Sequence, residues 1–241
     1  MKNTLFISDL HLDESRPHIT RAFFQFLETT AKNAEALYIL GDFFDAWIGD
    51  DDDQPLVQEV AEKLATLTQT GTQVFLMHGN RDFLLGETFA RRCNATLLTD
   101  ERCINLYGVK TLLLHGDSLC TADTEYMQYR NLVRTRAWQD QVLALPLSTR
   151  RAMAIESRNK SKNMNSLKAD DILDVTPSEV EKVFQQYQVK RMIHGHTHRP
   201  ARHPMIVEGK NCERIVLGDW HDSFWYINAS ENDCQLIEQK I

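Results

Sequence analysis

The chain has 241 residues, of which 42% are hydrophobic and 25% charged, and its formal net charge is −7. These proportions are ordinary for a soluble domain, and the length suffices for one sizeable core. Because no apolar run approaches 18 residues and a strand begins at the N-terminus, the sequence predicts neither a transmembrane helix nor a signal peptide. Five cysteines without metal or redox spacing predict reduced thiols in a cytoplasmic protein, and we expect no nucleic-acid partner.

The first part of the chain predicts strands that alternate with helices. Short apolar runs predict buried strands at 5–7, 37–40 and 74–77. Apolar residues at helical spacing predict helices at about 18–31 and 55–70. Two more strands are expected near 103–107 and 110–114, joined by a turn at Tyr107-Gly108.

From residue 123 to about residue 174 the strand pattern stops and the sequence becomes helical. Nine Lys or Arg and two Asp or Glu lie between Arg130 and Lys168, which gives this stretch a net charge of +7. A solvated helix face would also explain such a run. Because the run coincides with the break in the strand pattern, we expect a basic helical lid at 123–174, inserted into a core formed by 1–122 and 175–241.

The last part of the chain returns to strands. Thr176-Pro177-Ser178-Glu179 predicts a capping box with proline at the first helical position, for a helix that ends near Tyr187. Strands follow near 191–193, 213–217, 224–228 and 234–238. The expected fold class is α/β, with two packed β-sheets flanked by helices and the inserted helical lid.

Seven residues of metal-ligand type stand in five short blocks, four of which directly follow a predicted apolar strand. They are Asp9, His11, Asp42, Asn80, His115, His196 and His198. Because sites in open α/β sheets form beyond the carboxyl ends of strands, we expect these side chains to converge. Their donor atoms suit Mn²⁺, Fe²⁺, Co²⁺ or Zn²⁺, and the absence of cysteine argues against a structural zinc site. Seven ligands exceed the needs of one ion, whereas two ions that share a carboxylate match the count.

The five blocks read D-x-H, G-D-x-x-D, G-N-x-D, an isolated H and G-H-x-H, in that order. In this order they resemble the calcineurin-like metallophosphoesterase superfamily. The alternative interpretation is a set of capped turns and core histidines, which five ordered blocks disfavour. Within the superfamily, the chain resembles the UDP-2,3-diacylglucosamine hydrolase family, from Leu5 to about Trp220. The segments that carry this likeness are 37–42, 47–51, 78–84, 115–120 and 193–200.

The resemblance implies a hydrolase of lipid A biosynthesis with two divalent ions, and by the same resemblance we expect Mn²⁺. One ion would be held by Asp9, His11, Asp42 and His198, and the other by Asp42, Asn80, His115 and His196. Water would attack the α-phosphorus of UDP-2,3-diacylglucosamine and release UMP and 2,3-diacylglucosamine 1-phosphate. The catalytic residues implied are Asp42, Asn80, Arg81 and His115. The substrate contacts implied are Asn80, Arg81, Asp123, Ser161, Asn165, Lys168 and His196.

Such a substrate also requires an apolar slot for two acyl chains under the lid. Candidates to line it are Leu132, Val133, Met153, Ile155 and Met164. We expect the lid's positive side chains to meet diphosphate and lipid headgroups, with the protein peripheral on the cytoplasmic face of the inner membrane. The lid should contribute little to the metal chemistry, because it contains none of the seven ligands.

Several assignments have an open alternative. Arg81 either contacts phosphate or forms a salt bridge with Asp82 or Asp45. The acidic run 50–53 is expected to be a solvated loop, and His194 a core histidine. Asp45, Asp82 and Asp117 could orient the ligand histidines. The alternative function is a phosphodiesterase or nucleotide phosphatase of the same fold with a soluble substrate, and a third possibility is a non-catalytic binding module.

Overall fold

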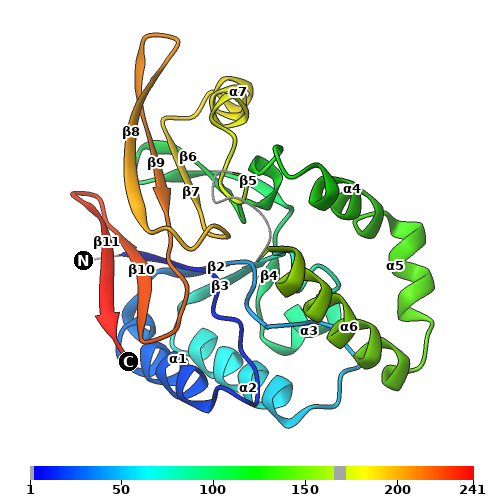
Figure 1. The fold of residues 1–241 in the computed structure, drawn as a ribbon. Helices are drawn as coiled ribbons and strands as arrows, with labels where there is room; N and C mark the ends of the chain where they lie inside the picture. The colour runs from blue at the N-terminus through cyan, green and yellow to red at the C-terminus, as the bar shows by residue number, and fades with distance from the viewer. Residues whose placement is uncertain (1–2, 166–171) are drawn as a thin grey trace.

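The fold is described from a computed structural model, which places residues 3–165 and 172–241, with side chains outside 161–165 (Figure 1). A six-stranded sheet has the order β11-β10-β1-β2-β3-β4, and β1 to β4 run parallel. Its strands are β1 (Thr4–Ile7), β2 (Ala36–Leu40), β3 (Gln73–Met77), β4 (Thr96–Leu97), β10 (Ser223–Ala229) and β11 (Cys234–Lys240).

A second sheet of five strands has the order β5-β6-β7-β9-β8, and its three central strands are parallel. Its strands are β5 (Glu101–Leu106), β6 (Val109–Leu114), β7 (Arg191–His194), β8 (Ala201–Val207) and β9 (Lys210–Val216). The predicted turn at Tyr107-Gly108 joins β5 to β6, and both residues have positive φ.

The two sheets pack face to face, which confirms the expected α/β class with two packed sheets flanked by helices. Phe6, Leu40 and Met77 of the first sheet share one cluster with Leu113 and Ile193 of the second. Side chains next to these in sequence point to the opposite face of each sheet, because side chains alternate along a strand. Both faces of these strands are therefore buried, and this explains why the strands appear in the sequence as continuous apolar runs.

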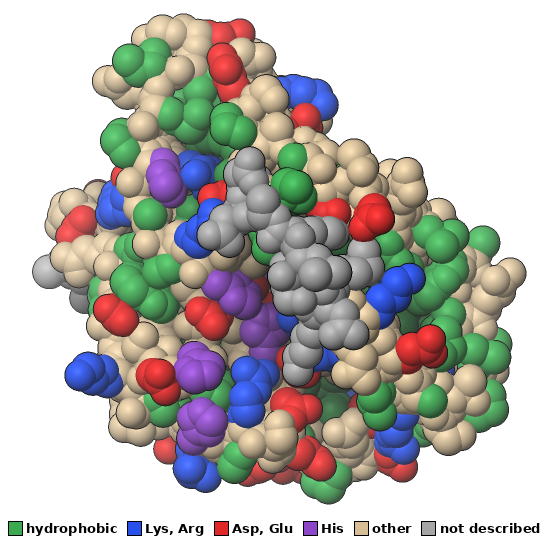
Figure 2. Space-filling view, viewed as in Figure 1, with side chains coloured by type: hydrophobic (Ala, Val, Ile, Leu, Met, Phe, Trp, Pro, Cys, Tyr) green, Lys and Arg blue, Asp and Glu red, His purple; other side chains and the backbone are tan. Residues whose placement is uncertain are grey.

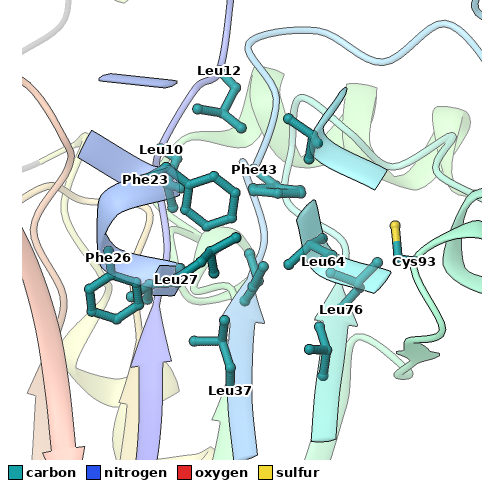
Figure 3. Close-up of a cluster of buried hydrophobic side chains, with 14 of the residues drawn as sticks. Leu10, Leu12, Phe23, Phe26, Leu27, Leu37, Phe43, Leu64, Leu76 and Cys93 are labelled. Atoms are coloured by element: carbon teal, nitrogen blue, oxygen red, sulfur yellow. The ribbon is translucent and has the colours of Figure 1, made fainter. Parts of the chain in front are cut away.

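Helices cover the outer face of each sheet. On the six-stranded sheet lie α1 (Pro17–Thr29), α2 (Pro55–Gln69) and the short α3 (Glu87–Arg92), and η1 (Ala31–Asn33) follows α1. Figure 3 shows Phe23 and Phe26 of α1 and Leu64 of α2 above Leu37 and Leu76 of the strands. This layer fixes the strands whose exits carry the first ligand blocks.

The outer face of the five-stranded sheet is covered by α7 (Pro177–Tyr187). Val180 and Phe184 of this helix pack in one cluster with Leu112 of β6. Pro177 is at the start of the helix as predicted, but the capping box is wrong, because Thr176 makes no side-chain capping bond. The Thr176 hydroxyl instead accepts a hydrogen bond from the Ala122 amide, 3.1 Å away.

The segment 123–174 leaves the sheets and contains three helices. They are α4 (Thr124–Val133), α5 (Arg136–Leu143) and α6 (Leu147–Asn165). In Figure 1 they lie together beside the edge of the sheets that carries β4 and β5. Within residues 3–165 and 172–241, no helix is long and apolar enough to cross a membrane.

The elements that were not predicted are α3, β4 and β8, together with the short 3-10 helices η1 and η2 (Asp117–Leu119). β8 lies at the edge of its sheet and contains Pro204, which an edge strand tolerates because not every amide there needs a partner. Its sequence gives no apolar run, since most of its residues are not buried.

Candidate metal centre

The seven predicted ligands lie in loops that leave parallel strands of both sheets. Asp9 and His11 follow β1, Asp42 follows β2 and Asn80 follows β3, all in the six-stranded sheet. The histidines of the last two blocks, His115, His196 and His198, follow β6 and β7 of the other sheet. In the space-filling view, histidine side chains gather beside acidic and basic ones near the middle of one face (Figure 2).

The first group of ligands consists of Asp9, His11 and His198. Asp9 Oδ1 lies 3.3 Å from His198 Nε2, and the Nε2 atoms of the two histidines are 3.3 Å apart. One donor atom of each residue falls within 4.8 Å of the others, so a single ion could contact all three.

The second group consists of Asn80, His115 and His196. Asn80 Oδ1 lies 2.9 Å from His115 Nε2 and 2.8 Å from His196 Nδ1. The other ring nitrogen of His115 lies 2.9 Å from the Leu40 carbonyl oxygen, where its N–H can donate and fix the ring. An amide oxygen and two imidazoles thus face one point.

Asp42 stands between the two groups. Its Oδ2 lies 3.8 Å from His11 Nδ1, and its Oδ1 lies 3.6 Å from His115 Nε2. The Arg81 amide also donates to Oδ1, at 2.8 Å. One carboxylate therefore presents an oxygen to each group, which is the arrangement that a shared ligand requires.

The backbone at this site is strained. Five of the seven residues have a left-handed φ, between 48° and 68°, and they are Asp9, His11, Asp42, His196 and His198. Such conformations are uncommon for residues with a side chain and collect at functional sites. The same loops also require glycine where chains meet, because a Cβ on Gly79 would overlap Asp42 Oδ1 and one on Gly195 would overlap Asp9 Oδ2.

The charges at the site are unbalanced without cations. Burial raises the pKa of Asp42 to about 7, and the negative charges of Asp82 and Asp9 add to the rise against the opposing charge of His115. Burial would also raise the pKa of Asp9, but its close pairing with His198 holds this pKa below its ordinary value. The same pairing raises the pKa of His198 to about 9, although burial opposes it. Two buried carboxylates that repel each other would be relieved by cations between them.

Two buried ligand atoms have no hydrogen-bond partner among the described residues, namely Asp9 Oδ1 and His11 Nδ1. A buried polar atom without a partner is costly, so it points to a missing ligand. Both atoms belong to the first group, and both are of the type that binds divalent transition ions. The residues present therefore fit a metal centre.

Of the two roles predicted for Arg81, the salt bridge with Asp45 is present at long range. Arg81 Nη1 lies 3.7 Å from Asp45 Oδ1, and its Nε lies 3.4 Å from Asp42 Oδ2. Asp82 is not its partner, since the Asp82 carboxylate accepts from the amides of Phe43 and Gly79, at 2.7 and 2.6 Å. Arg81 thus has a buried carboxylate at the site as a neighbour, and its side chain remains 27% exposed.

The three acids proposed to orient histidines have other partners. Asp82 holds two loops together through backbone amides, and Asp45 pairs with Arg16 and Arg81. Asp117 accepts from Tyr126 and Arg130 of α4. His194 is a core histidine as predicted, fully buried beside Arg214 Nη1 at 3.0 Å, and burial together with the charge of Arg214 lowers its pKa to about 3.

The expectation of a solvated acidic loop at 50–53 holds for Asp51 and Asp53, whose side chains are 60% and 71% exposed, but is wrong for Asp50 and Asp52. The Asp50 carboxylate accepts from the amides of Gly86 and Phe89 at 2.8 and 2.9 Å, and so holds the start of α3. Asp52 is buried, and it pairs with Arg151 of α6 at 3.0 Å. The sequence could not show these partners, because they lie some 35 to 100 positions away.

Apart from Arg81, only Asp123 of the predicted substrate contacts outside the ligand set is described in full. It is buried and caps α4, where its Oδ1 accepts from the Tyr126 amide at 3.1 Å. The side chains of Ser161 and Asn165, and all of Lys168, lie outside the described residues. These four assignments stay predictions.

Sequence reasoning missed three residues that lie against the site, namely Tyr126 and Arg130 of α4 and Arg134 at its C-terminal cap. Their spacing of four residues, which puts them on one helix face, was the available signal.

Comparison with known proteins shows the family. Residues 2–200 match the model of the calcineurin-like phosphoesterases. A UDP-2,3-diacylglucosamine hydrolase of Cellvibrio japonicus is 59% identical over 97% of this chain and 98% of its own length. The protein of that name from Hahella chejuensis is 51% identical over 98% and 97%.

A solved archaeal phosphodiesterase shares the fold, with a TM-score of 0.51 at 13% identity over 99% of both chains. Membership of the phosphoesterase family implies divalent metal ions, and the two clusters of candidate ligands agree with this. The chain belongs to the calcineurin-like phosphoesterase family and, within it, to the UDP-2,3-diacylglucosamine hydrolases.

Proposed function

We propose that this chain hydrolyses the pyrophosphate of UDP-2,3-diacylglucosamine to UMP and 2,3-diacylglucosamine 1-phosphate, a step of lipid A biosynthesis. The substrate is the one in the names of relatives that match almost the whole chain. The observation that carries the proposal is the Asp42 carboxylate, which presents one oxygen to each of two groups of ligand-type side chains.

The first ion would be held by Asp9, His11, Asp42 and His198, and the second by Asp42, Asn80, His115 and His196. Two Mn²⁺ ions held there would lower the pKa of water toward neutrality and offset charge on the phosphate oxygens. Asp42 and His115 keep the two groups at a fixed separation. Arg81, partly exposed beside Asp42, is placed to donate to the phosphate oxygens on which charge develops.

We also propose that the segment 123–174 is a lid that receives the acyl chains. A cleft of about 370 Å³ opens between α6 and the loops that follow β1 and β2. Its apolar wall includes Phe44, Ile48 and Ile155, and it also contains Asp45, which neighbours Arg81. Of the residues expected to line an acyl slot, Ile155 lines this cleft, Val133 is buried elsewhere, and the Met164 side chain is not described.

Peripheral association with the cytoplasmic face of the inner membrane belongs to the same proposal. It is supported by apolar side chains that the lid leaves exposed, such as Leu132 at 55% and Ile155 at 64%. A lipid substrate in a bilayer requires such a surface. Binding of the protein to vesicles that contain anionic lipid tests it.

The decisive experiment is hydrolysis of UDP-2,3-diacylglucosamine by the Mn²⁺-loaded protein in ¹⁸O-labelled water. Attack on the α-phosphorus puts the label in UMP, whereas attack on the β-phosphorus puts it in the sugar 1-phosphate. His115→Ala should abolish turnover, and the exposed His18→Ala is the matched control. Equal turnover of lipid-free UDP-sugars would favour the soluble-substrate alternative, and failure to bind Mn²⁺ would favour a non-catalytic module.

A further inference from the structure

Helix α4 places three polar side chains on the face that it turns toward the site. Tyr126 Oη donates to Asp117 Oδ2 at 2.6 Å, and Arg130 Nε donates to the same oxygen at 2.8 Å. Arg134 Nη1 donates to Asp100 Oδ1 at 3.0 Å, while Arg130 Nη2 donates to the other oxygen of Asp100 at 3.1 Å. Two acids of the core are thus shared by two arginines of one helix.

These contacts reach the loops that carry the second group of ligands. Asp117 is buried and stands two residues after His115. Arg134 Nη2 donates to the Gly79 carbonyl oxygen at 2.9 Å, and Gly79 directly precedes Asn80. The loop at Gly79 has little freedom to move, since its own amide is bonded to Asp82.

The ring of Tyr126 completes the set of contacts. It lies nearly parallel to the His196 imidazole, with an interplanar angle of 29° and centroids 6.1 Å apart. The neighbourhoods of Asn80, His115 and His196 therefore all touch α4. No hydrogen bond or ion pair described here joins α4 to Asp9, His11 or His198 of the first group.

We propose that Arg134 is a positioning residue for the Asn80, His115 and His196 group, so that α4 supports one half of the metal centre. Its guanidinium joins the Gly79 carbonyl to Asp100 and stacks over the Phe83 ring at 5.7 Å, and in this way it fixes where Asn80 points. Groups that orient metal ligands typically change metal affinity about 10–100-fold when they are removed. This inference rests on the proposed two-ion site.

The test is titration of the metal-free full-length protein with Mn²⁺, followed by calorimetry. In the native protein two binding events are expected. Arg134→Met keeps the aliphatic stem but loses both polar contacts, and it should weaken one event about 10–100-fold and leave the other unchanged. Arg134→Lys can keep only one contact and should give an intermediate loss. Arg136→Met is the matched control, because Arg136 is a neighbouring lid arginine whose side chain is 89% exposed and pairs within its own helix.

Circular dichroism establishes that each variant is folded. If Arg134→Met does not fold, Asp100→Asn replaces it, because this change weakens the Arg134–Asp100 contact from the acidic side. Unchanged affinities in folded Arg134→Met would overturn the inference. Equal weakening of both events, or the same loss in Arg136→Met, would also overturn it, since these results indicate a global or bulk-charge effect. A native protein that binds one ion contradicts the two-ion site itself, and this result is distinct from the others.

Discussion

The inserted segment is attached to the core at two places of different character. The α4 region is attached to two loops that carry ligands, through Arg130 to Asp117 and through Arg134 to the Gly79 carbonyl. Helix α6 is attached to residues 45–53, which follow the ligand Asp42 in the loop between β2 and α2; there Arg150 donates to Asp51 Oδ1 at 2.8 Å and Arg158 pairs with Asp45. Arg150 is 4% exposed although Asp51 is largely in solvent.

The difference suggests the hypothesis that the two ends of this segment serve different tasks. Five of its arginines, at 130, 134, 150, 151 and 158, pair with acids of the core. The positive charge that the sequence suggested for diphosphate and lipid headgroups thus serves largely to dock the insertion. We expect α4 to affect the metal centre and α6 to affect the fit of the lipid substrate.

The largest effect on metal binding and turnover should come from Asp42→Ala, and the losses in the other variants can be compared with it. Because Asp42 faces both ligand groups, the variant should lose both Mn²⁺ binding events, and turnover should fall below detection. Elemental analysis and steady-state assays measure this, with Asp222→Ala, whose side chain is 97% exposed, as the control. One binding event of native strength in the variant would show that Asp42 is not shared.

Arg81→Ala should lower the rate at least about 10²-fold, the usual cost of one lost transition-state donor. Arg81 lies next to Asp42 of the metal centre and next to Asp45, which pairs with α6. The variant therefore tests whether Arg81 serves the reaction or the attachment of α6. The melting temperature should barely change, since the side chain is partly exposed. A large fall in melting temperature with a modest rate loss would make Arg81 structural, and the exposed Arg91→Ala is the comparison variant.

Arg150→Ala should raise KM for the diacyl substrate about tenfold, or ~1.4 kcal/mol, by releasing α6 from the 45–53 loop. Mn²⁺ affinity and turnover of a small aryl phosphodiester should stay at native values, because no predicted ligand lies in that loop. Arg136→Ala serves again as the exposed control. If metal affinity falls together with lipid turnover, the two attachments are not separable.

The smallest effect is a change in the reactivity of Cys120, which lies at the base of the insertion. Its Sγ is 3.9 Å from the Gly116 carbonyl and 4.0 Å from that of Leu173, and burial together with the charge of Asp117 raises its pKa to about 12. Since the thiolate is the reactive form, disulfide-reagent labelling at pH 8 should be slow in the native fold.

Release of α4 should accelerate this labelling severalfold, whereas release of α6 should not. The measurement uses Arg130→Met and Arg150→Ala in a Cys103→Ser background, because Cys103 is only partly buried and would react first. Equal acceleration in both variants would show that the insertion opens as one unit.

The sequence predicted well what is local along the chain. Four apolar runs and a shorter fifth one predicted the central strands, and the ligand blocks that follow them predicted side chains that converge, because parallel strands end at one edge. Side chains alternate along the six residues of β6, so that Leu112 and Leu114 are buried on one face of the sheet and Leu113 on the other.

What the sequence could not predict depends on distant partners. Asp51 and Arg150 are 99 positions apart, and Arg134 and the Gly79 carbonyl are 55 apart, so neither pair leaves a local pattern. The left-handed backbone at Asp9 and Asp42 is equally hidden, since these residue types do not require it. The capping box failed for the same reason, because a more distant amide, that of Ala122, took the Thr176 hydroxyl.

The candidate centre draws on both sheets, and this links the folding of the chain to its metal content. Asp9, Asp42 and Asn80 belong to one sheet, while the ligand histidines after β6 and β7 belong to the other. An ion that binds only when the sheets are docked stabilises the docked state by about 2.7 kcal/mol at a hundredfold excess over its Kd. A chelator should therefore lower the thermal midpoint of the whole protein, and a cell that is short of metal would lose the folded enzyme as well as its activity.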